Sequence, residues 1–401
     1  MAELRVVRCS SWDEHPGLLG AWDTLVAESA ADSVFLTREW LMSWWVAYGG
    51  KRQLTLLLCF DGAELVGLVP LYRAGVRTDL RVSLDVLRFV GDGTYDSDHL
   101  DLVARAGYEV DVVRAMVDWL VAQRAEWDLF DVDNIRADSP SLQALLGEIR
   151  ARGWSHTVVD EQHAVIDLPD TWDGYLASLS SSMRSGIRRK ERDAQKGKTI
   201  TFRRCEREAD LPAFLQQLYA MHGDRWENRG QPGSFAFPGR QAFYERLGRE
   251  LLARGWLSFW LLDVDGDPAA AEFGFRYGST HSFLQSGFSS THAHESVGIL
   301  LKSHILQGLI TDGIRHYDFL GGGEAYKLKW GPRLAHHLNL RCARERSVGA
   351  AVIEARKVVD TTKAWLHRTI PPSLAMPLRR GYRRLRPYRD ELLDDQEGSQ
   401  R

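Results

Sequence analysis

The feature that most constrains the fold is an order of predicted elements that occurs twice along the 401 residues. In each half, helical patterns precede two apolar segments separated by Asp-Gly, which is a strong signal for a β-hairpin. A further helical pattern and a short strand containing aspartate then follow. The repeated order predicts a structural duplication, and the alternation of helices with strands predicts an α/β sheet in each half.

The matching segments of the repeat can be named one by one. The first half has helices 16–28 and 37–48, strands 54–60 and 64–72, helix 109–123 and strand 128–135. The second half has helices 211–226 and 239–254, strands 257–264 and 268–277, helix 297–311 and strand 314–320. The alternative is that two unrelated α/β domains share a common hairpin. The matching order favours duplication, with a boundary near residues 167–170.

Composition excludes several classes of protein. A net charge of −3 gives no overall field for nucleic acid or anionic membrane, and no apolar stretch is long enough to span a bilayer. The start of the chain lacks the basic-then-apolar order of a signal peptide. Widely spaced cysteines predict neither a zinc site nor a disulfide framework: Cys9, Cys59, Cys205 and Cys342. We therefore expect a cytoplasmic protein.

Two regions are locally basic. The helical stretch 175–196 is dense in cationic side chains, namely Arg184, Arg188, Arg189, Lys190 and Arg192. It is either a solvated helix face or a contact for an anionic ligand. After a predicted helix at 348–366, six arginines lie between residues 379 and 389, and residues 390–401 are predicted to be disordered. This tail either contacts RNA, an anionic membrane surface or an acidic partner, or packs on the acidic remainder of the chain.

The start of helix 297–311 could bind phosphate. Ser296 can cap that helix, and Gly298 in its first turn allows close approach to the backbone N–H groups. His292, His294 and Glu295 just before it resemble metal ligands in spacing. No further histidine–carboxylate motif supports them, so no metal site is predicted.

Candidate groups for proton transfer lie on the following strands. Glu272 stands in an apolar strand, where its pKa should be raised unless it is paired, as suits a general base. The alternative is a salt bridge to Arg276. Asp318 lies at the end of a strand, where ligands of α/β sheets usually bind.

A glycine-rich segment follows Asp318. Gly321–Gly323 allow the backbone to turn freely, and five ionisable or aromatic residues come next: Glu324, Tyr326, Lys327, Lys329 and Trp330. A lysine here could neutralise phosphate or a developing oxyanion, and a tyrosine could protonate a leaving group. These residues favour a functional site over a structural loop.

Several motifs resemble the BioF2-like or CelD-like group of bacterial acyltransferases in the GNAT superfamily. They are residues 218–226 (LYAMHGDRW), 265–271 (DGDPAAA), 296–301 (SVGILL), 318–327 (DFLGGGEAYK) and Trp330-Gly331. The resemblance covers residues 170 to 345 well and the first half weakly. It implies two tandem GNAT-like domains, each a mixed twisted sheet flanked by helices, plus a basic C-terminal tail.

The resemblance also implies an activity. Residues 1–166 would be a scaffold that shapes the acceptor cleft, 167–346 the catalytic domain and 347–401 the helical tail. An acyl group would pass from acetyl-CoA or another acyl-CoA, used as co-substrate with no permanently bound cofactor, to an amine of a small molecule or an envelope or polysaccharide precursor. Ser296, Val297 and Gly298 would receive the CoA pyrophosphate.

Glu295 and Leu300 depart from the pyrophosphate loop of the superfamily, which gives weight to a related family. The Fem-type peptidyltransferases take aminoacyl groups from tRNA, and their basic helix and aromatic-Lys-x-x-aromatic-Gly string resemble residues 182–190 and 326–331. Lys327 and the arginines would then meet phosphates. A third possibility is a non-catalytic binding module in polysaccharide or envelope assembly.

The expected site combines these residues. The catalytic candidates are Glu272, Asp318, Tyr326 and Lys327. The substrate-binding candidates are Arg184, Arg188, His222, Arg225, Trp226, Glu324 and Trp330.

Overall fold

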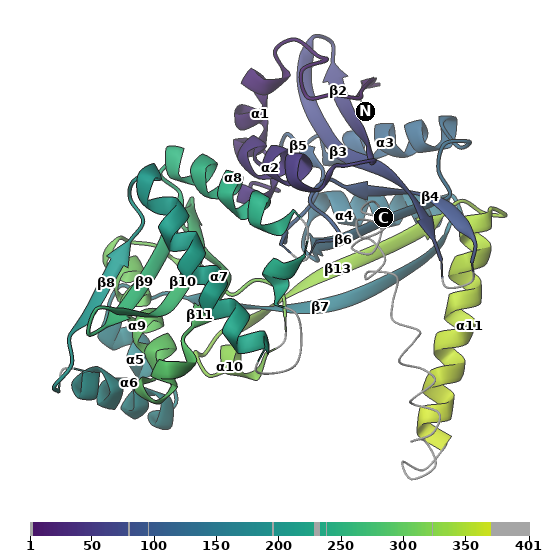
Figure 1. Ribbon diagram of the computed structural model, residues 1–401. Coiled ribbons are helices and arrows are strands. Elements are labelled where there is room, and N and C mark those ends of the chain that lie inside the picture. The colour runs from purple at the N-terminus through teal and green to yellow at the C-terminus, as the bar shows by residue number, and fades with distance from the viewer. Residues whose placement is uncertain are drawn as a thin grey trace, which may run out of the picture. The chain divides into compact units, whose positions relative to one another are not determined.

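The computed structural model describes residues 3–369, apart from 79–80, 95, 195, 228–232, 238 and 323. The arginine-rich segment 379–389 and the polar end of the chain lie outside the described residues. The chain forms two compact units (Figure 1). Unit 1 comprises Met1–Leu41, Gly49–Glu161 and His337–Arg401, and unit 2 comprises Met42–Tyr48 and Gln162–His336.

Unit 1 is built on a mixed sheet. Four strands pair antiparallel in chain order: β1 (Arg5–Cys9), β2 (Gln53–Asp61), β3 (Glu64–Arg77) and β4 (Ser83–Phe89). The short β5 (Val103–Ala104) pairs with β3. Helix α3 (Glu109–Ala122) leads into β6 (Leu129–Arg136), which lies parallel to β4. Its other helices are α1 (Leu18–Ala27), the start of α2 (Arg38–Tyr48), α4 (Pro140–Ala151) and α11 (Val348–Thr369).

Unit 2 repeats this order. Its antiparallel strands are β8 (Ile200–Arg204), β9 (Leu257–Val264), β10 (Asp267–Tyr277) and β11 (Thr280–Phe288). Helix α9 (Val297–Thr311) leads into β12 (His316–Asp318), which lies parallel to β11. The other helices are α5 (Trp172–Ser178), α6 (Ser181–Ala194), α7 (Leu211–Glu227), α8 (Arg240–Ala253) and α10 (Ala325–Leu328).

Each half of the chain completes the sheet of the other. The end of β7 (Ser155–Asp167) pairs antiparallel with β12 in unit 2, and most of β13 (Arg333–Ala343) pairs antiparallel with β6 in unit 1. The duplication and the α/β fold class predicted from the sequence are confirmed. The domain boundaries 1–166, 167–346 and 347–401 stay predictions, because this exchange of strands makes the compact units discontinuous in sequence.

Both Asp-Gly hairpins form. In unit 2, Val264 pairs with Asp267, and the two turn residues Asp265 and Gly266 have φ of 53° and 90°. Two successive positive φ values are typical of the turn that matches the twist of paired strands, and Asp-Gly tolerates them. In unit 1 the turn begins one residue later, at Gly62, because Asp61 still pairs with Glu64.

Helices cover both faces of the sheet in unit 2. The ring of Phe214 in α7 lies edge-on to that of Phe259 in β9. The ring of Tyr244 in α8 is tilted against that of Phe273 in β10. Figure 1 shows α7 against β10 and β11. Leu301 and Leu306 of α9 belong to the apolar cluster on the opposite face, together with residues of α5 and α6. The apolar face of α9 therefore fixes it on the sheet.

The prediction of one helix over 175–196 was wrong. Thr171 caps α5 by accepting a hydrogen bond from Gly174 N at 3.1 Å, and the helix stops at Leu179, whose backbone is extended. The buried side chains of Tyr175, Leu179 and Ile187 anchor both short helices to the core.

Among the described residues, no helix is long and apolar enough to cross a bilayer.

A buried carboxyl group in unit 1 makes stability depend on pH. Burial raises the pKa of Asp101 from 3.8 to about 7, and Ser139 Oγ and Leu102 N donate hydrogen bonds to it. The folded state holds this proton between pH 4 and 7 while the unfolded state has lost it, so stability from this group falls as pH rises through that window. Asp101→Asn should remove the loss, which amounts to at most about 4 kcal/mol at pH 8. Urea unfolding of the parent and the variant at pH 5 and pH 8 measures this loss of unfolding free energy.

The matched control for Asp101 is Asp118→Asn, on the exposed side of unit 1. Asp118 is 61% exposed and accepts from Arg152. This variant should keep the pH dependence of the parent protein. Equal pH dependence in Asp101→Asn and the parent would contradict the prediction.

Candidate functional site

Two parallel strands of unit 2 part at one end. β11 and β12 pair only at 280 with 316, 281 with 317 and 282 with 318. Beyond Asp318 the chain turns away, and Phe319 N donates to Ala164 O of β7 at 2.9 Å. In β11, Gln285 pairs with Phe273 and Phe283 with Gly274, which leaves Leu284 as the extra residue of a β-bulge. Bulges are common beside active sites because they redirect side chains and backbone groups.

Helix α9 begins beside this separation. Val297 is buried, whereas Gly298 is exposed and a Cβ placed on it would have nothing within 4 Å. The first turn of a helix carries N–H groups without intrahelical partners, so an open approach here suits an anionic group. The structure therefore keeps Val297 and Gly298 where a phosphate could reach the backbone.

The expected capping role of Ser296 was wrong. Ser296 occupies the N-cap position with a left-handed backbone, φ 57° and ψ 35°, and its side chain makes no capping hydrogen bond. A capping serine normally has an extended backbone, which aims its hydroxyl at the helix. Glu295 pairs with Lys198, and hydrogen bonding to that lysine lowers the pKa of the Glu295 carboxyl.

Glu272 is ion-paired in the core of unit 2. Its side chain is buried, Lys302 Nζ donates to Oε2 at 2.7 Å and Tyr317 OH donates to Oε1 at 2.7 Å. Burial opposes ionisation, but the charge of Lys302 outweighs it and the pKa of Glu272 falls to about 2. The raised pKa was expected for an unpaired Glu272, and the structure instead pairs this carboxylate with Lys302. The alternative partner Arg276 was wrong, since Arg276 pairs with Asp312. A carboxylate of such low pKa is a weak proton acceptor.

Lys327 closes the glycine-rich loop. Its ammonium group is buried and donates to Gly321 O at 2.7 Å, Phe319 O at 3.2 Å and Gly322 O at 3.3 Å, and lies 2.9 Å from Glu324 Oε2. Gly322 has a φ of 103°, which only glycine adopts readily. The lysine therefore holds the loop backbone in one shape by charge-assisted hydrogen bonds.

The residues next to Lys327 in sequence lie on the same side of the candidate site as the glycine-rich loop. Asp318 is buried, and its Oδ1 accepts from Leu320 N at 2.7 Å. Tyr326 is 39% exposed, and its ring lies edge-on to Phe319. Trp330 is buried, and its carbonyl accepts from Tyr175 OH at 2.8 Å, an anchor that sequence reasoning missed. Asp318, Glu324, Tyr326 and Lys327 are thus brought together by one short segment.

The basic helix α6 packs beside this segment. Burial lowers the pKa of Lys190, and repulsion from Arg189 and Lys329 lowers it further. Arg188 lies 3.5 Å from Asp173, whereas Arg184, Arg189 and Lys190 have no ion pair with any acidic side chain that the structure describes. Neighbouring cations without acidic partners are suited to bind an anion.

The remaining candidates lie on α7. His222 is buried near Phe235, and its backbone N would lie 3.0 Å from a Cβ placed on Gly287. Gly287 points away from the face that α9 covers, because its neighbour Ser286 pairs with Glu272 on that face. Arg225 and Trp226 lie in α7, but their side chains are outside the described part of the chain.

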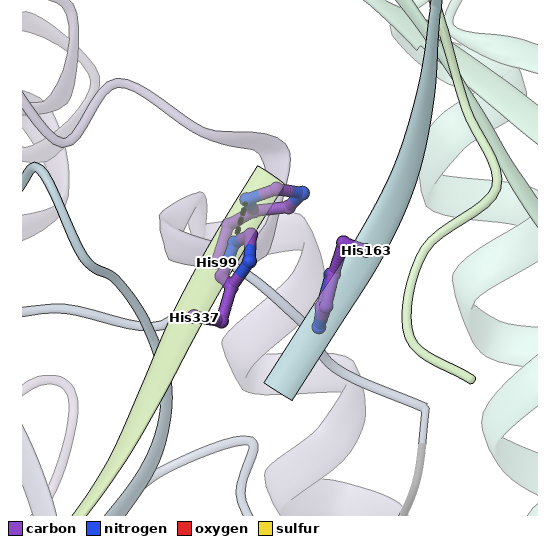
Figure 2. A group of neighbouring side chains, drawn as sticks. All are labelled: His99, His163 and His337. Carbon is purple, nitrogen blue, oxygen red and sulfur yellow. Dashed lines mark hydrogen bonds between the residues drawn. The ribbon is translucent and has the colours of Figure 1, made fainter. Parts of the chain in front are cut away.

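A pair of histidines in unit 1 was not singled out from the sequence. His337 of β13 and His99 share a hydrogen bond of 2.8 Å between Nε2 and Nδ1, with ring centroids 4.6 Å apart (Figure 2). His99 has a positive φ of 48°. The third residue drawn, His163, belongs to unit 2 and is fully buried in β7. No spacing in the sequence marks His99 and His337 as neighbours, because 237 residues separate them.

Comparisons with known proteins agree with this geometry. Residues 181–328 match the model of an acetyltransferase (GNAT) domain. The structure of FemX aligns with a TM-score of 0.56 at 14% identity, over 80% of this chain and 95% of that one. A conserved protein of unknown function from Bacteroides thetaiotaomicron aligns with a TM-score of 0.54 at 15% identity, over 84% and 100%. No curated protein sequence matches significantly.

Proposed function

We propose that the protein is an N-acyltransferase that uses an acyl-CoA thioester, with acetyl-CoA as the simplest donor, because residues 181–328 match the model of an acetyltransferase (GNAT) domain. The observation that carries the proposal is the β11–α9–β12 arrangement. Its strands part after three paired positions, α9 begins there with an open Gly298, and the loop closed by Lys327 forms another wall.

The proposed reaction places an amine against the thioester. The nitrogen attacks the acyl carbon, the amine loses a proton and the thiolate leaves. Holding the two reactants in contact supplies much of the acceleration. Tyr326, the partly exposed phenol of the segment, would donate a proton to the leaving sulfur, and Asp318 would help to position or deprotonate the acceptor.

The acceptor is proposed to be an amine of a small molecule or of an envelope or polysaccharide precursor, with unit 2 carrying the chemistry. A cytoplasmic location is also proposed. It is supported by the four cysteines, which are all buried and free of disulfides.

One alternative is supported by a specific observation. Arg184, Arg189 and Lys190 of α6, with Lys329 nearby, form a cationic surface without acidic partners among the described side chains. Such a surface fits the phosphates of an aminoacyl-tRNA donor. A thermal-shift comparison separates the donors: acetyl-CoA or a longer acyl-CoA should raise the melting temperature, and aminoacyl-tRNA should not. Stabilisation by aminoacyl-tRNA alone would overturn the acyl-CoA proposal.

Substitution at Gly298 tests where the donor binds. Gly298→Leu should raise the KM for acyl-CoA at least tenfold, because its side chain would fill the approach to the helix start. Stability should not fall, since leucine is a better helix former than glycine. Steady-state kinetics with varied acyl-CoA and a thermal melt measure both effects.

The matched control is Gly308→Leu in the same helix. Gly308 is also exposed, with nothing within 4 Å of a Cβ placed on it, but lies nearly three turns further along α9. This variant should keep the KM of the parent. An unchanged KM for acyl-CoA in Gly298→Leu would show that the donor does not bind at the start of α9.

A further inference from the structure

Three polar side chains meet inside the apolar core of unit 2. Lys302, Glu272 and Tyr317 are 5%, 2% and 0% exposed. They lie on three different elements, namely α9, β10 and β12. A lysine and a glutamate so deeply buried are rare unless they are paired. None of the three needs to touch a substrate in the reaction proposed above.

Their hydrogen bonds form a closed network. Lys302 Nζ donates to Glu272 Oε2 at 2.7 Å and also to Tyr317 OH, which itself donates to Glu272 Oε1 at 2.7 Å. The ammonium also lies over the rings of Phe283 and Phe319, at 4.0 Å and 5.1 Å from their centroids. Aromatic faces attract a cation, so these rings add to the attraction of Glu272, while the charge of Lys327 opposes that of Lys302.

Stability alone does not explain this arrangement. Burial lowers the pKa of Lys302 and raises that of Tyr317, while Lys302 keeps the pKa of Glu272 near 2. Desolvation of two charges offsets most of their attraction, and buried ion pairs are often replaceable by apolar residues without loss of stability. Such a pair fixes the relative positions of the elements that carry it, because its hydrogen bonds are satisfied in only one geometry.

The three residues lie close in sequence to the two sides of the proposed site, namely the start of α9 and the loop held by Lys327. Lys302 lies five residues after the first residue of α9, and Tyr317 directly precedes Asp318. Tyr317 also pairs with His281 in the middle of the three registers that join β11 to β12. The carbonyl of Phe319, two residues further, accepts from Lys327. The network therefore ties the start of α9 and the Lys327 loop to the same strand, β10.

We propose that Lys302, Glu272 and Tyr317 form a positioning network. It fixes the start of α9 and the loop residues 319–322 and 324–327 relative to the sheet, and so sets the opening in which acyl transfer occurs. This inference rests on the proposed function. The three residues act through the groups that they hold in place and do not contact the reacting atoms.

The test removes the polar network and keeps its shape. In the variant Lys302→Met/Glu272→Met/Tyr317→Phe, which puts apolar side chains of similar size at all three positions, the melting temperature should stay within a few degrees of the parent. The kcat should fall on the order of 10²-fold, because misplacement of about 1 Å costs that much. A merely structural role would move the melting temperature and leave the kcat of the folded enzyme unchanged. A folded triple variant with the parent's kcat and KM would overturn the proposal.

A second ion pair of unit 2 supplies the control. Arg203 of β8 binds Asp263 of β9 through both carboxylate oxygens. The variant Arg203→Met/Asp263→Asn removes an ion pair at the edge of the sheet, where the Arg203 side chain is 39% exposed. It should retain the kcat of the parent.

Hydrogen exchange gives a readout that needs no donor. The backbone amides of Leu320 and Lys327 donate to Asp318 Oδ1 and Glu324 O. They should exchange at least tenfold faster in the triple variant than in the parent and the Arg203/Asp263 control. If the parent transfers no acyl group from any donor, the proposed function fails and exchange alone decides the positioning role. Unchanged exchange at these amides would then reject the network.

Discussion

Replacing Lys327 by methionine should lower kcat on the order of 10²-fold or more while the protein stays folded. Methionine keeps the buried stem but removes the ammonium that three backbone carbonyls and Glu324 share. Those carbonyls then lose their donor, and the loop that carries Tyr326 leaves its position. Lys327 lies in a helix of four residues next to exposed turns, so the global fold should tolerate the change.

The measurement is kcat with saturating acyl-CoA, beside a thermal melt. Lys357→Met is the matched control, because Lys357 pairs with Glu354 on the exposed side of α11 in unit 1. Ammonium should partly restore the activity of Lys327→Met by occupying the position of the lysine nitrogen among the carbonyl oxygens of Phe319, Gly321 and Gly322, and it should leave the control unaffected. An activity equal to the parent's in Lys327→Met would show that the site lies elsewhere.

Glu272→Ala should be the most destabilising single substitution considered, by about 3–5 kcal/mol, because it leaves the Lys302 ammonium buried without its counter-charge. Lys302→Met in the same chain should recover most of that loss. Denaturant unfolding of the two single variants and the double variant measures the coupling between the residues. If Glu272→Ala unfolds at the same denaturant concentration as the parent, the ion pair does not exist in solution.

The Lys302–Glu272 pair also predicts that the free energy of unfolding falls at acid pH. The pKa of Glu272 is lowered from 4.5 unfolded to about 2 folded, so its contribution to stability is present above pH 4.5 and is lost as pH falls towards 2. Lys302→Met/Glu272→Gln should lack this loss. Unfolding free energies at pH 5 and pH 3 therefore differ less in the double variant than in the parent.

Local patterns were sufficient for most of the elements. The helical pattern of residues 297–311 predicted the bounds of α9, and two Asp-Gly dipeptides located both hairpins. The glycine-rich segment after Asp318 was expected to be a site, and its members do lie together because they are close in sequence. Such features depend on residues within a few positions of one another, where side-chain period and turn chemistry decide the conformation.

Partners distant in sequence could not be inferred in the same way. The sequence left Glu272 either as a general base of raised pKa or as the partner of Arg276 on its own strand, yet Glu272 pairs with Lys302 from a helix packed on the sheet. Lys302 sits in an apolar helix, where a lone lysine is ordinarily assigned to the exposed face. Only the packing of α9 on β10 shows that this lysine points inwards.

The exchange of β7 and β13 has the same origin. A strand carries its apolar pattern in its own residues, but the sheet edge that it joins depends on which edge is unpaired once both halves have folded. The repeated order of elements, the hairpins and the glycine-rich segment were therefore determined locally, by period and turn chemistry. Tertiary packing decided the strand exchange, the buried Lys302–Glu272–Tyr317 network and the carbonyl cage around Lys327, because each depends on groups that only the folded chain brings within hydrogen-bonding distance.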